Sequence, residues 1–137
     1  AATLKIRKKY EHVLFKRFLF EIAEKIAILE NAKVIVTGES LGQVSSQTTP
    51  NLIASEPDTD LLIIRPLIGF DKQEIIDKAK QINTYESSIL KYKDVCSIIV
   101  KNPSTNIKKE LIDKFYKNSK LKYIANKTLA KAKYIEY

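Results

Sequence analysis

The chain has 137 residues, of which 45% are hydrophobic, and this is the size of one domain with a core of its own. Lys and Arg outnumber Asp and Glu by 24 to 16, which gives a net charge of +8. One cysteine and one histidine exclude an internal disulfide and a multi-cysteine zinc site, and no apolar run reaches the roughly 20 residues of a membrane span. We therefore expect a single domain over residues 1–137, a cytoplasmic location, no metal site and no membrane partner.

The positive charge is concentrated at the two ends of the chain. Residues 1–17 carry six Lys and Arg against one Glu, residues 106–137 carry nine Lys against three acids, and the segment between them is net acidic. Lysines interleaved with tyrosines can follow a phosphate backbone and stack on bases. The residues expected to bind nucleic acid are Lys5, Arg7, Lys8, Lys9, Lys108 and Lys109. The alternative is that these charge runs are only solvated faces.

The first half of the chain alternates helical and strand patterns. Apolar residues between Leu14 and Leu29 have helical spacing and predict a long helix over residues 10–30 with one broad buried face. Residues 33–37 predict a short buried strand, and residues 41–54 predict a helix that is interrupted or ends near Pro50. The apolar run 61–64 predicts a second buried strand. A helix is expected over residues 71–82, opened by a capping box of Asp71 and Glu74.

The second half is predicted to be mainly helical. Residues 95–100 fit either a short strand or a packed loop, residues 106–118 have helical period, and residues 121–135 have it more weakly. A helix between two strands is the order of a parallel βαβ unit. Because parallel sheets are normally wider than two strands and covered on both faces, the predicted fold class is α/β, as part of a larger doubly wound parallel sheet. The uncovered strand edge is expected to recruit a partner.

The loop after the first strand is the main candidate site. Residues 37–48 are Thr-Gly-Glu-Ser-Leu-Gly-Gln-Val-Ser-Ser-Gln-Thr, and ligands of open α/β sheets bind at the carboxyl ends of strands. Gly38 can take backbone angles closed to other residues and lets a ligand approach the main chain. Ser40 and Gln43 have capping-box spacing, which would order a helix start and present N–H groups to a ligand. The alternative is a turn and a helix cap without a ligand.

Glu39 has several possible roles in this loop. A carboxylate at a strand end can hold magnesium through water, position a ribose, or cap a neighbouring helix. The sequence leaves these three roles open.

Residues 37–48 and the segment 65–76, Arg-Pro-Leu-Ile-Gly-Phe-Asp-Lys-Gln-Glu-Ile-Ile, together resemble the tRNA 4-thiouridine synthetase family, ThiI. The resemblance continues in order through residues 84–86, Thr-Tyr-Glu, to a cysteine followed by Pro103 and Thr105, and it covers roughly residues 10–106. It implies the C-terminal half of a PP-loop ATP pyrophosphatase domain, of the adenine nucleotide alpha hydrolase type. Residues 106–137, with their helical period and basic charge, are expected to be a helical extension beyond it.

The resemblance also implies an activity. Members of the family transfer sulfur to uridine in tRNA: ATP adenylylates the uracil oxygen, and sulfur from a cysteine persulfide displaces AMP. The family is also linked to thiamine thiazole synthesis. The alternative function is a non-catalytic tRNA-binding or assembly module derived from the same family.

The nucleotide-binding candidates combine the loop with the first helix. By resemblance, Lys16 falls where an ATP-contacting Arg usually stands, and Gly38 and Gln47 match nucleotide-contacting positions. Lys is a point charge in place of a bidentate fork, so Arg17 is kept as an alternative for the phosphate contact. The full candidate set is Lys16, Arg17, Gly38, Glu39, Ser40 and Gln47.

Cys96 resembles the family cysteine that accepts or relays sulfur. Lys91 and Lys93 would favour its thiolate, and Asp94 would oppose them. The alternative is a small apolar core residue, a common use of free cysteine. Family members often have two adjacent cysteines here, and this chain has Val95 at the first place, so a second sulfur would come from elsewhere.

One family element does not occur in the sequence. This is the PP-loop, Ser-Gly-Gly-x-Asp-Ser, whose backbone amides cradle pyrophosphate. We therefore expect ATP, with Mg²⁺ as its usual companion, to be used only when another chain supplies a PP-loop, and the sequence leaves open whether this chain is itself an enzyme. The expected partners are tRNA, a sulfur donor protein, and either a second copy in a homodimer or a chain carrying the PP-loop half.

Overall fold

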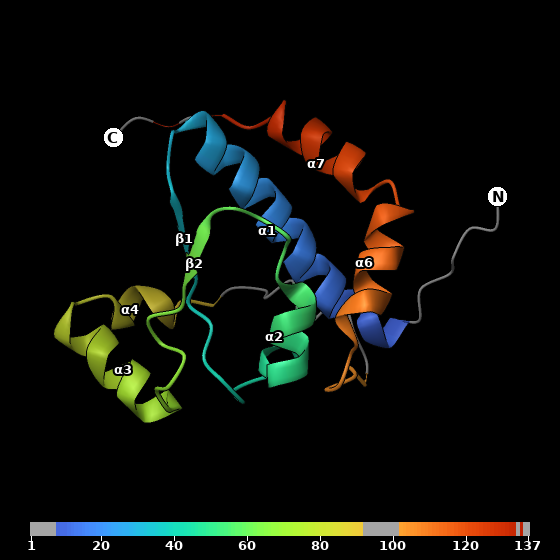
Figure 1. Ribbon diagram of the computed structural model, residues 1–137. Helices are drawn as coiled ribbons and strands as arrows, with labels where there is room; N and C mark the ends of the chain where they lie inside the picture. The colour runs from blue at the N-terminus through green and yellow to red at the C-terminus, as the bar shows by residue number, and fades with distance from the viewer. Residues whose placement is uncertain (1–7, 92–101, 134, 136–137) are drawn as a thin grey trace.

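The computed structural model describes residues 8–91, 102–133 and 135. Helices dominate it, and two short strands form a parallel pair (Figure 1). In chain order the elements are η1 (Lys8–Tyr10), α1 (Glu11–Leu29), β1 (Val34–Val36), η2 (Ser45–Gln47), α2 (Thr49–Ser55), β2 (Leu62–Ile64), α3 (Lys72–Gln81), α4 (Tyr85–Ser88), α6 (Lys109–Lys117) and α7 (Leu121–Leu129). The α/β fold class is thus confirmed, with a helical C-terminal part.

Helix α1 is the centre of the molecule. Figure 1 shows it between α6 and α7 on one side and the strands and α2 on the other. Its buried residues include Val13, Leu14 and Phe20, so the predicted helix is confirmed but the predicted buried face is only partly confirmed. Leu19 and Leu29, expected to be buried, are exposed, and Leu19 borders a cavity between α1 and β1.

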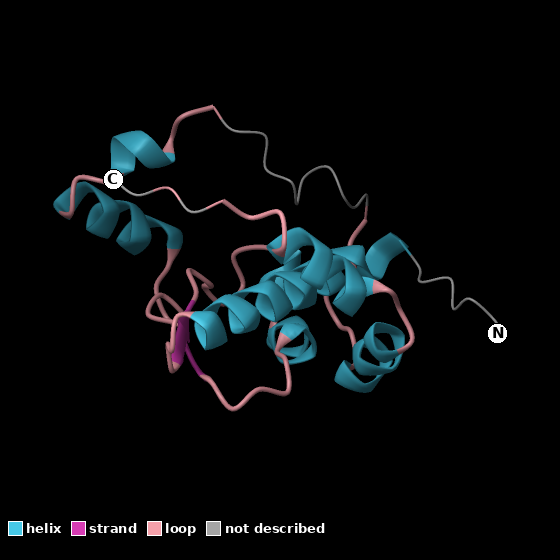
Figure 2. Cartoon of the chain, turned by 90° about the horizontal axis from the view of Figure 1, so that it is seen from above, coloured by secondary structure: helices cyan, strands magenta, loops and turns pink. Residues whose placement is uncertain are grey.

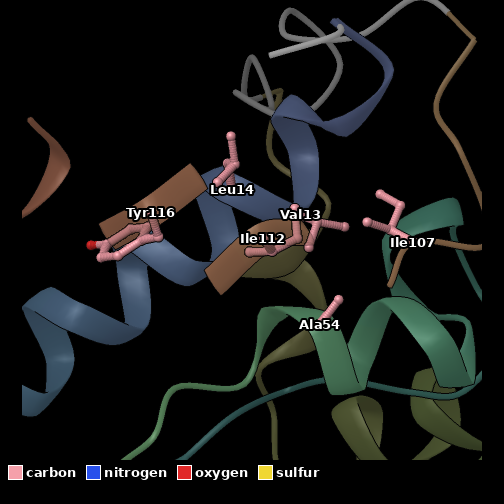
Figure 3. Close-up of a cluster of buried hydrophobic side chains, with 6 residues drawn as sticks. All are labelled: Val13, Leu14, Ala54, Ile107, Ile112 and Tyr116. Carbon is pink, nitrogen blue, oxygen red and sulfur yellow. The ribbon is translucent and has the colours of Figure 1, made fainter. Parts of the chain in front are cut away.

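The main core lies between helices and not on the sheet. Figure 3 shows its six buried side chains, which come from α1, α2, α6 and the turn before α6: Val13, Leu14, Ala54, Ile107, Ile112 and Tyr116. The burial of so much apolar surface in one cluster fixes α6 against α1 and α2. The basic C-terminal helices therefore share the core of the first half of the chain.

The two strands form the expected parallel pair. Their register places Val34 opposite Leu62, Ile35 opposite Ile63 and Val36 opposite Ile64. The burial expected for these strands is wrong in part: Ile35 is buried, but Val36 and Leu62 are 65% and 61% exposed. A parallel strand is normally covered on both faces, and within the described residues this pair is not.

Helix α3 lies beyond the strands, away from the helical core (Figure 2). The predicted capping box at its start is confirmed: Asp71 accepts a hydrogen bond from the Glu74 amide, and Glu74 accepts one from the Asp71 amide. The helix packs on α4 and has no fully buried residue. None of the helices in the described residues is long and apolar enough to cross a membrane.

The helix predicted over residues 41–54 is wrong in its first half. The chain makes turns until η2, and α2 begins only at Thr49, with Pro50 in its first turn. Proline suits this position, because its missing N–H has no partner there in any helix. The predicted capping box of Ser40 and Gln43 is also wrong, since the Ser40 hydroxyl donates to the Phe70 carbonyl at 2.7 Å.

The C-terminal helices differ from the predicted ranges in length. Helix α6 confirms the helical pattern of residues 106–118, and α7 ends at Leu129 instead of extending to residue 135. The alternative of a strand or loop over residues 95–100 lies outside the described residues.

Candidate functional site

The loop of residues 37–48 continues the pairing of β1 with the chain after β2. The amide of Thr37 donates to the Ile64 carbonyl at 3.0 Å, and the amide of Leu41 donates to the Ile68 carbonyl at 3.1 Å. The Ser40 hydroxyl adds the bond to Phe70, and Ser40 is buried. The first part of the loop is therefore held against residues 65–70 at the carboxyl ends of both strands.

Glu39 is the centre of an ion-pair network in this loop. Its side chain is buried, and the residue is only 5% exposed. The carboxylate pairs with Lys16 from α1, accepts a hydrogen bond from Arg65 Nε at 2.7 Å, and accepts one from the Thr37 hydroxyl at 3.2 Å. Arg65 then reaches Glu56 Oε2 at 2.8 Å. The network joins α1, the end of β1, the end of α2 and the end of β2.

The network determines the charge of its members. Burial alone would raise the pKa of the Glu39 carboxyl, but the hydrogen bonds and charges of Lys16 and Arg65 together outweigh burial and hold this pKa below its ordinary value. Burial would lower the pKa of Arg65, and its contacts with Glu39 and Glu56 raise it. Glu39 is therefore an anion held between two cations, and its three contacts are with side chains and not with a helix N-terminus.

Lys16 and Arg17 are neighbours in sequence but point to different surroundings. Lys16 pairs with Glu39, and its ammonium group also donates to the Ser46 carbonyl at 3.4 Å, so it contacts both parts of the loop. Arg17 Nη2 pairs with Asp113 Oδ1 of α6 at 3.2 Å, and Arg17 Cζ lies 5.8 Å from the centroid of the Tyr116 ring. The structure brings Lys16, Glu39 and the loop together and places Arg17 against the C-terminal helices.

The glycines of the loop differ from the expectation. Gly42 has a φ of 80°, and its amide donates to the Gln47 carbonyl at 2.9 Å, so the left-handed conformation belongs to Gly42. Gly38 does not have a positive φ, which corrects the prediction that it uses angles closed to other residues. A Cβ added at Gly38 would meet no atom within 4 Å, so its main chain faces open space. Gln47 lies at the end of η2 and is half-buried.

A cavity of about 240 Å³ lies next to this network, between α1 and β1. Its walls are mainly apolar and include Leu19, Phe20 and Val36. Lys16, Thr37 and Glu39 line it as well. Such a cavity combines an apolar wall with a charged group at the carboxyl end of a strand, which is the general form of a ligand site in α/β sheets.

The sequence around this site matches a known protein family. Residues 2–121 match the model of the family described as thiamine biosynthesis protein (ThiI). The chain belongs to this family.

Two ThiI relatives carry names that state an activity. A protein of Thermoanaerobacter sp. (strain X514), named "Probable tRNA sulfurtransferase", is 45% identical over 120 residues, which are 86% of this chain and 32% of the relative. The tRNA sulfurtransferase of Thermoplasma acidophilum is 49% identical over 107 residues, which are 78% of this chain and 22% of the relative. The chain thus spans a third or less of the length of these relatives.

A solved structure has the same fold over this chain. It is described as the crystal structure of a 4-thiouridine synthetase–RNA complex with bound ATP. The match has a TM-score of 0.85 and 40% sequence identity, and it covers 95% of this chain and 34% of the other. The two strands and the C-terminal helices of the present chain are therefore arranged as in that 4-thiouridine synthetase.

Sequence reasoning missed a buried polar cluster beside the loop of residues 37–48. Its central residue is Asn51. This residue is 0% exposed. Its amide group donates to the Ser45 carbonyl at 2.6 Å and to the Ser104 carbonyl at 2.7 Å, and its oxygen accepts from the Ile107 amide at 3.0 Å. Asn51 thus joins η2 to residues 104–107. The signal in the sequence was weak: a lone Asn beside Pro50 suggests a turn as readily as a core residue.

His12 lies next to this centre. Its Nε2 is 3.1 Å from the Ser104 carbonyl oxygen, so Nε2 carries the proton and donates it. Burial lowers the pKa of His12, the bond to Ser104 opposes this, and the charge of Lys16 adds to the lowering. The histidine is therefore neutral and structural. In the described residues, no group of three His, Cys, Asp or Glu side chains is placed to hold a metal ion.

The expected RNA-binding residues have different positions. Lys5 and Arg7 lie outside the described residues. Lys8 and Lys9 belong to η1, and Lys108 is exposed at the start of α6. Lys109 is occupied by internal contacts, with Asp58 at 3.0 Å and Asp113 at 3.1 Å.

Cys96 also lies outside the described residues, so its role in sulfur transfer remains a prediction. Ser104 and Thr105, which come later in the chain and are described, are held by several hydrogen bonds. Besides the bonds of Ser104 to Asn51 and His12, the Thr48 hydroxyl donates to the Thr105 carbonyl at 2.6 Å.

Proposed function

We propose that this chain forms part of the catalytic α/β layer of a tRNA 4-thiouridine synthetase, which uses ATP to transfer sulfur to a uridine in tRNA. The observation that carries the proposal is the loop of residues 37–48, held at the carboxyl ends of two parallel strands by the Glu39 network. The names of the relatives and the bound RNA and ATP of the similar structure support the same activity.

In this proposal the loop binds the nucleotide. Gly38 offers a main chain open to solvent, and Lys16 offers a cation between Glu39 and the Ser46 carbonyl. Glu39 holds the ammonium group of Lys16 in place before ATP arrives. A phosphate that then approaches Lys16 shares this cation with Glu39. Gln47, at the end of η2, contributes an amide that can donate and accept.

Sulfur transfer requires two further parts. The resemblance assigns Cys96 to the persulfide step, with a sulfur donor protein as its source. The Ser-Gly-Gly-x-Asp-Ser loop does not occur in these 137 residues, so the pyrophosphate of ATP, with Mg²⁺, must be bound by a PP-loop supplied from elsewhere. We place that segment beside β1, on the edge that faces away from β2. The reaction then takes place in the cytoplasm, where tRNA is available.

The test is a reconstitution with two glycine variants. The protein is mixed with a polypeptide carrying the PP-loop, ATP, a persulfide-loaded sulfur donor and an unmodified tRNA transcript, and 4-thiouridine is measured by mass spectrometry. Gly38→Ala is expected to weaken ATP binding about tenfold, because its methyl group occupies the space through which the ligand approaches the backbone. Gly69→Ala is the matched control, since its Cβ also meets nothing within 4 Å.

The two variants should fold equally well, so a difference in ATP binding reports the ligand and not stability. Equal ATP binding by both variants would contradict the nucleotide role of the loop. Cys96→Ala should abolish thiolation while pyrophosphate release continues, because adenylylation precedes the sulfur step.

The alternative function is a non-catalytic tRNA-binding or assembly module. The basic residues of α6 and α7 favour it, because helices 109–117 and 121–129 carry five lysines against two acids. Binding of tRNA that survives Cys96→Ala, without thiolation in any mixture, would support this alternative.

A further inference from the structure

A second cavity, of about 280 Å³, lies between α1 and the C-terminal helices. No residue of the loop 37–48 lines it, so it is separate from the proposed nucleotide site. Its lining combines three cations, two carboxylates and a phenol: Arg17, Lys117, Lys122, Asp58, Asp113 and Tyr116. We call it the Arg17 pocket.

Two polar atoms of the Arg17 pocket lack partners. Arg17 is 8% exposed and Tyr116 is 3% exposed, so both residues form the floor of the pocket. Arg17 Nη2 pairs with Asp113 at 3.2 Å, but Arg17 Nη1 and the Tyr116 hydroxyl are buried without a hydrogen-bond partner among the described residues. Buried polar groups in native proteins are nearly always hydrogen-bonded, so two neighbouring exceptions need an explanation.

Both unpartnered atoms are hydrogen-bond donors. The guanidinium group of Arg17 has no acceptor atom. Burial, supported by the charge of Glu21 and opposed by that of Arg17, raises the pKa of Tyr116 to about 12, so the phenol keeps its proton at neutral pH. The ligand that would satisfy the two atoms is therefore an acceptor, such as an oxyanion.

The charges of the pocket also favour an anion. Asp113 is paired with Arg17 and with Lys109, and Asp58 is paired with Lys109. Lys117 and Lys122 are exposed and form no ion pair with any residue from 8–91 or 102–133. The carboxylates are thus already compensated, and the two lysines are left at the mouth of the pocket.

We propose that the Arg17 pocket binds one phosphodiester group of an RNA backbone, with Lys117 and Lys122 at its mouth and Arg17 and Tyr116 as the inner donors. The inference rests on the proposed function for its RNA ligand. The phosphate draws the Arg17 guanidinium toward the pocket and gives Nη1 the acceptor that it lacks. Arg is well suited to this, because its planar fork matches the oxygens of a phosphate.

RNA is favoured over a free nucleotide by the surroundings of the pocket. Further exposed lysines stand nearby, Lys114 on α6, Lys127 on α7 and Lys120 immediately before α7. A polyanion can use several of these charges at once, and a mononucleotide cannot.

The first experiment compares two double variants with the same change of charge. Lys117→Gln/Lys122→Gln removes the lysines of the pocket, and Lys114→Gln/Lys127→Gln removes one exposed lysine from each of the same helices outside it. Binding of an unmodified tRNA transcript is measured over a series of salt concentrations. The pocket variant is expected to bind about tenfold more weakly and to reduce the slope of log K against log salt by about one unit, as loss of one phosphate contact predicts.

The control variant should change the slope by less than half as much. Equal effects of the two double variants would overturn the proposal, because they would indicate a diffuse positive field without a site. In that case the wild-type protein still binds RNA, so the proposed function stands. Absence of RNA binding by the wild-type protein would instead contradict the proposed function itself.

The second experiment uses Tyr116→Phe. This change keeps the ring against Arg17 and in the core but removes the hydroxyl, which has no partner in the unliganded protein. The melting temperature should therefore stay the same or rise, while RNA affinity falls several-fold. Unchanged RNA affinity would overturn the role of the hydroxyl. ATP alone is titrated as well: a weaker ATP affinity of Lys117→Gln/Lys122→Gln than of Lys114→Gln/Lys127→Gln would overturn the assignment to RNA.

Discussion

A carboxylate buried at the end of a strand needs cations around it, and Glu39 takes them from two distant parts of the chain. Lys16 comes from α1, 23 residues earlier, and Arg65 follows β2. Removing one member of such a network leaves the other charges buried without a counter-charge, and this lowers stability strongly. Replacing the whole network by apolar side chains of similar size would change stability much less. Glu39 therefore holds the two strand ends and α1 together while it positions the cation of Lys16.

We predict that Glu39→Gln lowers the free energy of unfolding by roughly 2–3 kcal/mol at pH 7, because two cations lose their counter-charge. The folded-state pKa of Glu39 is lowered, so its contribution to stability is complete above the ordinary carboxyl value of 4.5 and is lost as the pH falls through the folded pKa, below 4.5. Urea unfolding of both proteins at several pH values measures this.

The difference between wild type and Glu39→Gln should therefore shrink in acid. Glu30→Gln is the control, because Glu30 is exposed and forms no ion pair with any described residue. A difference that stays constant from pH 7 to pH 3 would show that the charge of Glu39 does not stabilise the fold.

At the scale of elements, the loop 37–48 and residues 104–107 are joined by side chains and not by a sheet. Asn51 in the first turn of α2 bonds to both segments, and Thr48 bonds to Thr105. The start of α2 therefore couples the proposed nucleotide loop to residues 104–107. This coupling fixes the position of residues 104–107 against the loop.

We predict that Asn51→Ala lowers the free energy of unfolding by roughly 2–4 kcal/mol, because the Ile107 amide and the Ser45 carbonyl lose their Asn51 partner and the Ser104 carbonyl keeps only His12 as a donor. Urea unfolding followed by circular dichroism measures it. Asn126→Ala in α7 is the control, since Asn126 is exposed and should change stability by less than about 0.5 kcal/mol. Equal stability of the two variants would contradict the role of Asn51 as a core hub.

The elements that the sequence could predict are those whose signals are local. The helical period of α1 and the capping box of Asp71 and Glu74 lie within a few residues, and both are confirmed. The helix expected from residue 41 failed because the Ser40 hydroxyl is taken by Phe70, 30 residues away. A contact of that separation leaves no pattern in the loop itself.

The candidate site follows the same division. The predicted order of strand, loop and strand correctly placed residues 37–40 at the carboxyl ends of the two strands, because parallel strands end on the same side of a sheet. Nothing in the spacing revealed that Arg65 pairs with Glu39 or that Asn51 is a core residue, since both contacts depend on tertiary packing. Arg17 faces Asp113 for the same reason.

At the scale of the whole molecule, the core and the sheet lie in different places. The buried cluster comes mainly from helices, and the strands lie at the margin of the helical core (Figure 1). Val36 and Leu62 of these strands are exposed. Within the described residues β1 has β2 on one side and no strand on the other. This arrangement predicts that the open edge of β1 pairs with another strand, from a second copy or from the segment that carries the PP-loop.

The edge can be tested with a proline. The Lys33 carbonyl and the Thr37 amide bond to β2, and parallel pairing uses alternate residues, so the amide of Val36 faces the open edge. Val36→Pro therefore removes a donor from this edge and leaves the bonds to β2 intact. The wild-type protein is expected to self-associate with increasing concentration in sedimentation velocity, and Val36→Pro is expected to stay monomeric.

Val36→Thr is the matched control, because threonine keeps the amide donor and the β-branched shape while it reduces apolar exposure. If pairing through the backbone causes association, the threonine variant should associate like the wild type. If exposed apolar surface causes it, the threonine variant should behave like the proline variant, and the open edge would not be the interface. A wild-type protein that remains a monomer at every concentration would contradict recruitment of a second copy, and the PP-loop segment would then be the strand that β1 requires.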